Sequence, residues 1–194
     1  QDRPVLVPPG DDGARLDALP APVISTDTQR EGVHFRWEWQ PPEAIGEKAV
    51  EITLSDLAAC YADPVSLFVN LGLPRTLAET DVARIYNGLH AALKRHNCRL
   101  GGGNIARSRA LSLDLFAVGQ GRRHLFPRRN AARPGEKLYV TGPLGLARCG
   151  LKALERESLK ILPPVKRFDG MLSILGPKGI AQLDFMLDRL HEYL

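Results

Sequence analysis

The sequence predicts an α+β fold in which a mixed β-sheet carries helices on one face. Two observations support this prediction. Short segments rich in β-branched or alternating apolar residues indicate strands, and two longer segments carry apolar residues at helical spacing. In chain order these segments run strand, strand, helix, strand, helix, strand, strand. Their interleaving implies a layer of helices packed on a sheet.

The expected strands differ in how much of each should be buried. The segment 65–71 is apolar nearly throughout, which indicates a central strand, whereas 111–117 alternates Leu or Ala with other residues, which indicates one core face. The segment 23–26 contains Val, Ile and Thr, which favour strands, and 5–7 is ended by Pro-Pro-Gly. A last strand is expected to begin at 137–140.

Two helices are expected between these strands. The first, 42–60, has Pro and Glu at its start and an apolar stripe wide enough for the helix to be well buried. The second ends near Lys94 and has either Thr76 or Thr80 as its N-cap.

Length and composition indicate one domain with a small appendage. The chain has 194 residues, of which 44% are hydrophobic, enough for a substantial core. It has no apolar run near the ~20 residues of a membrane helix and no signal-peptide pattern at its start, so we expect a cytoplasmic protein without membrane contact. Cys60, Cys98 and Cys149 show no C-x-x-C spacing. They indicate reduced thiols, neither a disulfide framework nor a thiolate zinc site.

The formal net charge is +4, and the charges are unevenly distributed. Acids able to bind metal lie mostly in the first part of the chain, while one short segment holds Arg122, Arg123, Arg128, Arg129 and Arg133. This asymmetry suits a site for cations and a polyphosphate, and it equally suits a nucleic-acid patch. Nucleic acid is the weaker hypothesis, because the arginines lie in one loop without an aromatic RNA-binding signature or helix-turn-helix spacing.

The segment 23–35 is the first candidate for a functional site. An apolar strand ends in the oxygens of Ser25, Thr26 and Asp27, and a glycine turn then carries His34. Hard oxygen donors at the end of a strand predict a metal-sized negative site at a sheet edge. The alternative is that the single aspartate is an ordinary strand end.

Other segments carry weaker signals. Gly-Asp-Asp at 10–12 is by itself typical of a solvated turn. Asp56 should be exposed, capped or paired with a cation, because buried helices rarely carry bare carboxylates. Tyr86, beside the apolar stripe of the second helix, is by itself typical of a core residue. The three glycines at 101–103 let backbone amides approach an anion such as phosphate, but their spacing matches neither the P-loop nor the dinucleotide fingerprint.

Together these segments resemble thiamine-monophosphate kinases, which belong to the superfamily of aminoimidazole ribonucleotide synthetase and selenophosphate synthetase. The resemblance covers roughly residues 5 to 150. Its motifs, in the order found in that family, are GDD at 10–12, ISTDT at 24–28, EGVHF at 31–35, LSDLAA at 54–59, GGGNIARS at 101–108 and ARPGEKLYVTGPLG at 132–145.

The resemblance implies transfer of the γ-phosphoryl group of ATP to the phosphate of thiamine monophosphate, which makes thiamine diphosphate. It also implies several Mg²⁺ ions, a homodimer paired through the N-terminal domains, and a substrate contact by His34. The implied magnesium ligands are Asp12, Ser25, Thr26, Asp27, Asp56 and Asn104. The implied ATP contacts are Tyr86, Gly103, Asn104 and Arg129. No catalytic residue is assigned beyond these ligands, because phosphoryl transfer depends mainly on positioning and charge neutralisation.

Two departures from the family concern activity. The family usually has Asp where this chain has Asn104, so one metal position should be weaker. The motifs of the family's second domain are not found after Gly145. We therefore expect residues 1–136 to form an N-terminal domain for ATP and Mg²⁺ binding and dimerisation, and 137–194 to be a truncated or incomplete C-terminal domain.

The tail predicts a helix through Arg156, a connector with two prolines, and a final amphipathic helix. Natural truncation, an altered reading frame and residues missing from the numbered sequence would each explain it. Three hypotheses about function remain open. The chain is a thiamine-monophosphate kinase, or a kinase-derived domain that dimerises and binds Mg-nucleotide without turnover, or, less favoured, a nucleic-acid binder that uses the arginine loop.

Overall fold

The computed structural model describes residues 5–7, 12–140, 142 and 144–156 of the chain. The expected final helix and the acidic residue at position 11 lie outside the described residues. The chain divides into two compact units, Gln1–Pro134 and Gly135–Leu194, and each is described here by itself.

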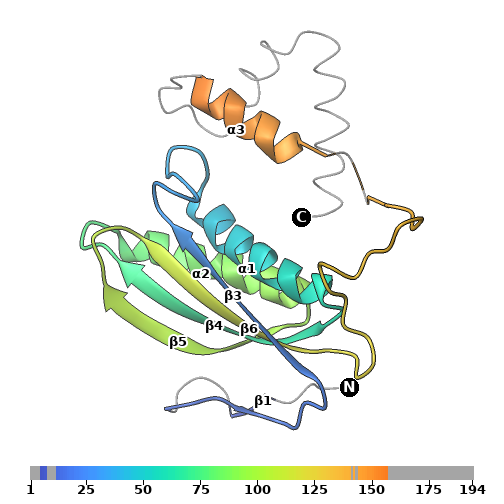
Figure 1. Cartoon of the computed structure of the whole chain (residues 1–194). Helices are drawn as coiled ribbons and strands as arrows, with labels where there is room; N and C mark the ends of the chain where they lie inside the picture. Colours follow the sequence, from blue (N-terminus) through green and yellow to red (C-terminus); the bar gives the residue numbers. More distant parts are fainter. Residues whose placement is uncertain (1–4, 8–11, 141, 143, 157–194) are drawn as a thin grey trace. The chain divides into compact units, whose positions relative to one another are not determined.

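In the first unit three strands come before the first helix and two strands follow the second, and one helix is described in the second unit (Figure 1). The elements are β1 (Val5–Val7), β2 (Arg15–Leu16), β3 (Pro22–Arg30), α1 (Pro42–Ala59), β4 (Asp63–Leu73), α2 (Glu79–Arg95), β5 (Arg99–Arg107), β6 (Ser112–Gln120) and α3 (Leu146–Arg156).

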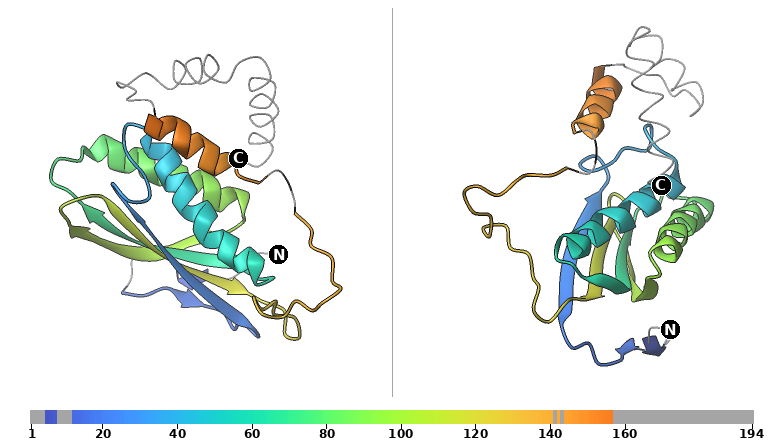
Figure 2. Two further views of the ribbon diagram at one scale, coloured as in Figure 1. Left: turned by 45° about the horizontal axis from the view of Figure 1, so that its top comes forward. Right: turned by 90° about the vertical axis from the view of Figure 1, so that its right-hand side faces the viewer.

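The first unit is built on a four-stranded sheet with strand order β3-β6-β4-β5. β6 pairs antiparallel with both β3 and β4, and β4 pairs parallel with β5, so the sheet is mixed. α1 and α2 pack on each other and cover one face of this sheet, as Figure 2 shows. The predicted fold class is confirmed, and so is the central position of β4.

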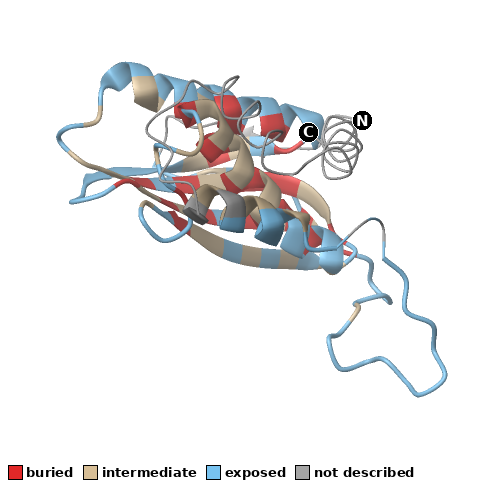
Figure 3. Cartoon of the chain, turned by 90° about the horizontal axis from the view of Figure 1, so that it is seen from above, coloured by how far each residue is buried: buried red, intermediate tan, exposed pale blue. Residues whose placement is uncertain are grey.

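The core lies between the sheet and the two helices. Along β6, Leu113, Leu115 and Ala117 are fully buried while the residues between them are not (Figure 3). This is the one-sided strand that the alternating sequence predicts. The two helices approach closely at Gly88, where an added Cβ would collide with the backbone carbonyl of Glu43.

The glycine segment at 101–103 lies in strand β5, which is missing from the expected order of elements, and this is the first correction to that order. Gly103 is extended with φ at +157°, and a Cβ added there would collide with the carbonyl oxygen of Val69 on β4. The glycine therefore allows two strands to pair closely, a constraint that local composition does not reveal.

Two further expectations are wrong. The N-cap of α2 is Ala78, whose side chain cannot make a cap hydrogen bond, so neither Thr76 nor Thr80 caps this helix. Residues 137–140 form no strand, because they pair with no other strand among the described residues, and Leu138 is 95% exposed. The expected helix ending at Arg156 is present as α3.

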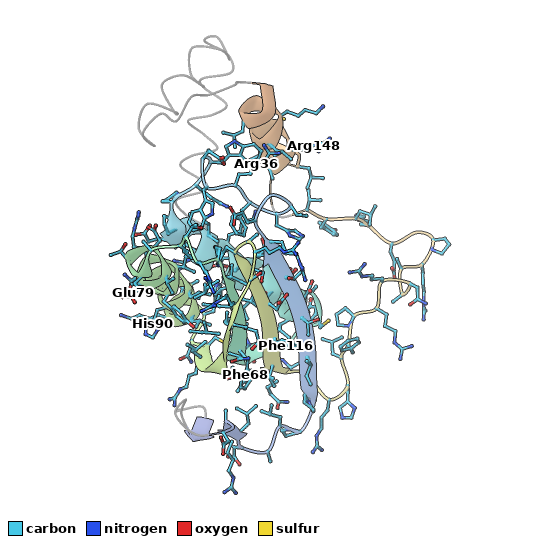
Figure 4. All side chains as sticks on the ribbon, turned by 90° about the vertical axis from the view of Figure 1, so that its left-hand side faces the viewer. Arg36, Phe68, Glu79, His90, Phe116 and Arg148 are labelled. Carbon is cyan, nitrogen blue, oxygen red and sulfur yellow. The ribbon has the colours of Figure 1, made fainter. Side chains whose placement is uncertain are left out.

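Within the first unit, both described helices pack on the same face of the sheet, and the other face is called the helix-free face here (Figure 1). On this face Phe68 of β4 is the register partner of Phe116 of β6, and both side chains are labelled in Figure 4. Phe116 and Ile24 are 41% and 68% exposed.

In the part of the chain that the structure describes, no helix has both the length and the apolar character needed to cross a membrane.

Candidate functional site

A row of polar side chains lies on the helix-facing side of edge strand β3. Ser25, Asp27 and Gln29 are in register with Ala117, Leu115 and Leu113 of β6, whose side chains form the core. The sheet residues beside this row therefore face α1, which packs against β3. The row places a hydroxyl, a carboxylate and an amide along the side of β3 that faces α1.

The row is connected to α1 by one hydrogen bond. Ser25 Oγ donates to Asp56 Oδ2 at 2.8 Å, and Asp56 lies near the C-terminal end of α1 with its side chain exposed. Of the three alternatives for this carboxylate, the structure shows an exposed group that accepts a hydrogen bond. Two of the residues predicted to bind magnesium are thus in direct contact, although 31 positions separate them in the chain.

An open pocket of about 370 Å³ adjoins this contact. Ser25 and Asp56 line one part of it, and Arg128 and Arg129 from the loop after β6 line another. Its remaining lining is Val23, Ile24, Ala59, Cys60, Phe126 and Pro127. The lining thus includes a carboxylate and a hydroxyl, which suit a cation, and two arginines, which suit an anion such as a phosphate.

The donor atoms in this region suit Mg²⁺. Ser25, Asp27 and Asp56 offer only oxygen, and Gln29 adds a buried amide oxygen that has no hydrogen-bond partner among the described residues. No group of three or more His, Cys, Asp and Glu side chains in the described ranges lies close enough to hold a metal ion. This arrangement fits Mg²⁺ bound by one or two carboxylates, with water and substrate phosphates completing its coordination.

Other predicted magnesium ligands lie elsewhere. Thr26 is in register with Phe116, so its side chain lies on the helix-free face, opposite to that of Asp27. Asp12 is exposed in the segment before β2 and does not line the pocket. Asn104 lies on β5, where its side chain accepts a hydrogen bond from the amide of Ile105 at 2.9 Å.

The predicted ATP contacts divide between two edges of the sheet. Arg129 lines the pocket beside β3, whereas Gly103 and Asn104 lie on β5 and Tyr86 on α2, which packs over β5. Burial raises the pKa of the Tyr86 hydroxyl, which is consistent with a ring packed on the core. Because two strands separate β3 from β5, their backbones are roughly 14 Å apart at about 4.8 Å per strand.

His34 lies in the turn that follows β3. Its imidazole is exposed, and its Nδ1 accepts a hydrogen bond from the amide of Arg30 at 3.1 Å. The carbonyl of His34 accepts a hydrogen bond from Nζ of Lys48 on α1 at 2.7 Å. His34 therefore lies at the far end of β3 from the pocket, on the same edge of the sheet.

Two residues of this edge were not singled out from the sequence. Lys48 belongs to no motif, and its contact with the His34 turn joins segments 14 positions apart, so no local pattern reveals it. Arg128 was seen only as a member of the arginine cluster. It lines the same pocket as Asp56 only because the loop after β6 comes near β3 and the end of α1.

Comparison with known proteins gives consistent matches. The sequence pattern of the "AIR synthase related protein, N-terminal domain" matches residues 10–121. A thiamine-monophosphate kinase of Aquifex aeolicus is 36% identical over 155 residues, which is 79% of this chain and 50% of that protein.

Two solved structures are similar to this chain. One is AaThiL complexed with AMPPCP and TMP, with 35% identity, a TM-score of 0.67, and coverage of 79% of this chain and 49% of that one. The other is a thiamine-monophosphate kinase from Stenotrophomonas maltophilia K279a, with 33% identity, a TM-score of 0.68, and coverage of 78% and 48%. The chain spans about half the length of the relatives it matches.

Proposed function

The chain belongs to the AIR synthase related family, and from that premise we propose that it supplies the nucleotide- and metal-binding part of a thiamine-monophosphate kinase. The proposed reaction transfers the γ-phosphoryl group of ATP to thiamine monophosphate and yields thiamine diphosphate. The observation that supports this proposal is one pocket lined both by the hydrogen-bonded pair Ser25 and Asp56 and by Arg128 and Arg129. The names of the similar kinases, and the ligands AMPPCP and TMP in one of them, support the choice of substrates.

In this proposal the acidic residues and the arginines bind different parts of Mg-ATP. Bound Mg²⁺ would neutralise charge on the transferring phosphates. Asp27 and Asp56 would hold it through carboxylate oxygens, with Ser25 orienting Asp56 by the hydrogen bond between them. Arg128 and Arg129 would bind phosphate oxygens directly. No general base is required, because the acceptor is itself a phosphate that is ionised at neutral pH.

We restrict the proposed single-chain site to the β3 edge. Asp27, Asp56 and Ser25 are the proposed metal ligands, Arg129 the proposed ATP contact, and His34 the proposed contact to thiamine monophosphate. Asp27 does not line the pocket itself but lies two residues along β3 from Ser25, on the same face of the strand. Thr26 lies on the opposite face, Asp12 lies before β2, and Tyr86, Gly103 and Asn104 lie at or near the other edge of the sheet. For these residues the roles that the family resemblance implies stay predictions.

We also propose a homodimer formed through the helix-free face of the sheet. Ile24, Phe68 and Phe116 give this face an apolar centre, and association would remove it from water. The variant Phe116→Asp should sediment as a monomer, because a carboxylate in an apolar interface is strongly unfavourable. Leu138→Asp, at an apolar residue that is 95% exposed in the second unit, is the matched control. A wild-type chain that is monomeric at micromolar concentration contradicts this part of the proposal.

The domain assignment follows from the same premise. We propose that residues 1–136 form the domain for nucleotide and Mg²⁺ binding and dimerisation, and that 137–194 belong to an incomplete second domain. As an ATP-dependent enzyme, the protein would work in the cytoplasm, where ATP and Mg²⁺ are available.

A second candidate function is a kinase-derived domain that dimerises and binds Mg-nucleotide without turnover. One observation favours it: the chain spans about half the length of the kinases that it matches. Both candidate functions include Mg-nucleotide binding in the pocket. They differ only in whether the phosphoryl group is then transferred to thiamine monophosphate.

One assay separates them. We would measure Mg²⁺-dependent formation of thiamine diphosphate from ATP and thiamine monophosphate by the 194-residue chain, with Asp27→Asn as control. Turnover that Asp27→Asn abolishes supports the kinase and excludes the binding module. Nucleotide binding without turnover supports the binding module. Absence of Mg-nucleotide binding contradicts both.

A further inference from the structure

The turn that carries His34 is held in place from several sides. The backbone of Glu31 donates to the carbonyl of Leu111 at 3.0 Å, and the Glu31 carboxylate accepts from the Leu111 amide at 2.9 Å. Gly32, at a φ of +78°, donates to the carbonyl of Phe35 at 2.8 Å, and Phe35 is only 3% exposed. The turn thus has a buried end and two hydrogen bonds to the segment before β6.

Lys48 supplies the contact on the helix side. Its ammonium donates to the carbonyl of His34 at 2.7 Å, a hydrogen bond strengthened by the charge of the donor. Among the described residues, no carboxylate lies within ion-pair distance of it. The side chain is half-buried, and burial lowers the pKa of Lys48. A partly desolvated ammonium that donates to one backbone carbonyl suits a structural clamp on that carbonyl.

The hydrogen bond from Arg30 sets the state of the imidazole. A backbone N–H can only donate, so Nδ1 of His34 accepts this bond through its lone pair. In the neutral ring the proton is then on Nε2. Because the imidazole is exposed, this Nε2–H is a hydrogen-bond donor available to a ligand.

The position of His34 along β3 indicates which part of the substrate it meets. Its ring adjoins the backbone of Arg30, three residues beyond Asp27, which corresponds to about 10 Å along a strand. If the phosphate of the acceptor lies at the Asp27 row, the other end of an extended substrate reaches the His34 turn. A neutral N–H donor suits an uncharged ring nitrogen, such as those of an aminopyrimidine.

We propose that Lys48 is a positioning residue that holds the His34 turn through its carbonyl and so presents Nε2–H of His34 to the heterocyclic end of the acceptor substrate. The part of this inference that concerns the substrate rests on the proposed function. The part that concerns positioning rests only on the hydrogen bonds of Lys48, His34 and Arg30.

The positioning part is tested by long-range ¹H–¹⁵N NMR of the imidazole in the full chain. The signals of His34 are identified among the five histidines by comparison with His34→Gln. The wild type should show the Nε2–H tautomer. In Lys48→Met this signature should give way to a mixture of tautomers, whereas Lys48→Arg, which keeps a donor, should retain it. Lys94→Met, an exposed lysine on α2, is the control.

A Lys48→Met variant that keeps the wild-type signature overturns the positioning role. Thermal unfolding of the same variants serves as a check on folding. Loss of the signature together with the cooperative unfolding transition would also count against the proposal, since it assigns Lys48 to one turn and not to the fold.

Titration with thiamine monophosphate and with Mg-AMPPCP tests the substrate part. Lys48→Met should weaken binding of thiamine monophosphate about tenfold, the effect of roughly one hydrogen bond, and leave binding of Mg-AMPPCP within twofold. Unphosphorylated thiamine should show the same relative loss, because the contact is to the heterocycle. A loss confined to the phosphorylated compound would place His34 at the phosphate and overturn the assignment. Failure of the wild type to bind thiamine monophosphate overturns the proposed function, while the tautomer measurement still decides the role of Lys48.

Discussion

The two edges of the four-stranded sheet differ in what their sequence motifs do. At the β3 edge, Ser25 and Asp27 face α1, and Asp56 and two loop arginines complete a pocket beside them. At the β5 edge, Gly101 and Gly103 lie where the neighbouring strand leaves no room for a side chain. The β3 edge thus carries charged groups of opposite sign, whereas the residue types at the β5 edge are limited by close packing against β4.

A motif shared with a family of enzymes is therefore not by itself evidence that its residues contact the ligand, because packing alone can require them. Gly103 is explained by the approach of the Val69 carbonyl, without any phosphate. Asp56 and Arg129 have no such packing explanation, because both are exposed and both line the same pocket. The central claim is therefore that Mg-nucleotide binds at the β3 edge of this chain.

The largest effect is expected for Gly103→Ala. The added Cβ would collide with a backbone atom that cannot move without breaking the β4–β5 pairing, so we expect a loss of about 3 kcal/mol or more in the free energy of unfolding, measured by urea denaturation. Gly13→Ala is the matched control, because no atom lies within 4 Å of its added Cβ. If Gly103→Ala were as stable as the wild type, the packing explanation would be wrong and a functional role for this glycine would be favoured.

The next largest effect concerns the carboxylates. Asp27→Asn and Asp56→Asn should each weaken Mg²⁺-dependent binding of AMPPCP by about 100-fold, measured by calorimetry, since each removes a charged ligand of a hard cation. Removal of Mg²⁺ by EDTA should weaken wild-type binding and leave both variants little changed. Asn104→Asp, which adds a carboxylate at the other edge, should alter binding less than twofold. A large gain in affinity for Asn104→Asp would show that both edges form one site.

A smaller effect is expected for the loop arginine. Arg129→Ala should weaken AMPPCP binding about tenfold, because a charge-assisted hydrogen bond to phosphate contributes roughly 1.5–3 kcal/mol, part of which Arg128 replaces. Arg107→Ala, at the end of β5, is the control and should leave binding unchanged. Equal losses for the two variants would indicate a general effect of positive charge and not a pocket contact.

The smallest effect lies away from both edges, between the helices. Arg84 donates to both carboxylate oxygens of Glu43 at 2.7 and 3.0 Å, and this hydrogen bonding lowers the pKa of Glu43. A carboxyl whose folded-state pKa is lowered stabilises the fold above its ordinary pKa, and this contribution disappears as the pH falls through the lowered value.

Glu43→Gln should therefore lower the melting temperature slightly at pH 7, and the difference from wild type should vanish in strong acid. Both groups are largely solvent-exposed, which keeps the effect small. Arg84→Gln, which removes the same hydrogen bonds from the other partner, should show a similar loss. A difference that grows as the pH falls would contradict the sign of this assignment.

The parts of the fold that depend on local patterns could be predicted from the sequence. The alternation along 111–117 indicates which side chains face the core, and Leu113 and Leu115 are indeed fully buried. The apolar run at 65–71 indicated a central strand, and its residues Val65, Leu67, Val69 and Leu71 are buried in β4, an inner strand of the sheet. In both cases the signal is burial, which the residue types report directly.

The parts that depend on distant partners could not be predicted. Glycines at 101–103 are typical of a loop, and only the position of β4 shows why a strand needs them. An apolar segment at 137–140 has strand character, but a strand forms only where another can pair with it. The contact of Lys48 with the His34 turn likewise joins a helix and a turn through one side chain and one carbonyl. The pairing of Ser25 with Asp56 was anticipated only through the family resemblance.

The most direct test of the central claim maps the nucleotide on the chain itself. We would record backbone amide NMR spectra of the 194-residue chain during titration with AMPPCP in the presence of Mg²⁺. The account predicts that the shifts concentrate at Ser25, Asp27, Asp56 and Arg129, and that the amides of β5 stay unchanged. Shifts concentrated at Tyr86, Gly103 and Asn104, with β3 unaffected, would contradict it.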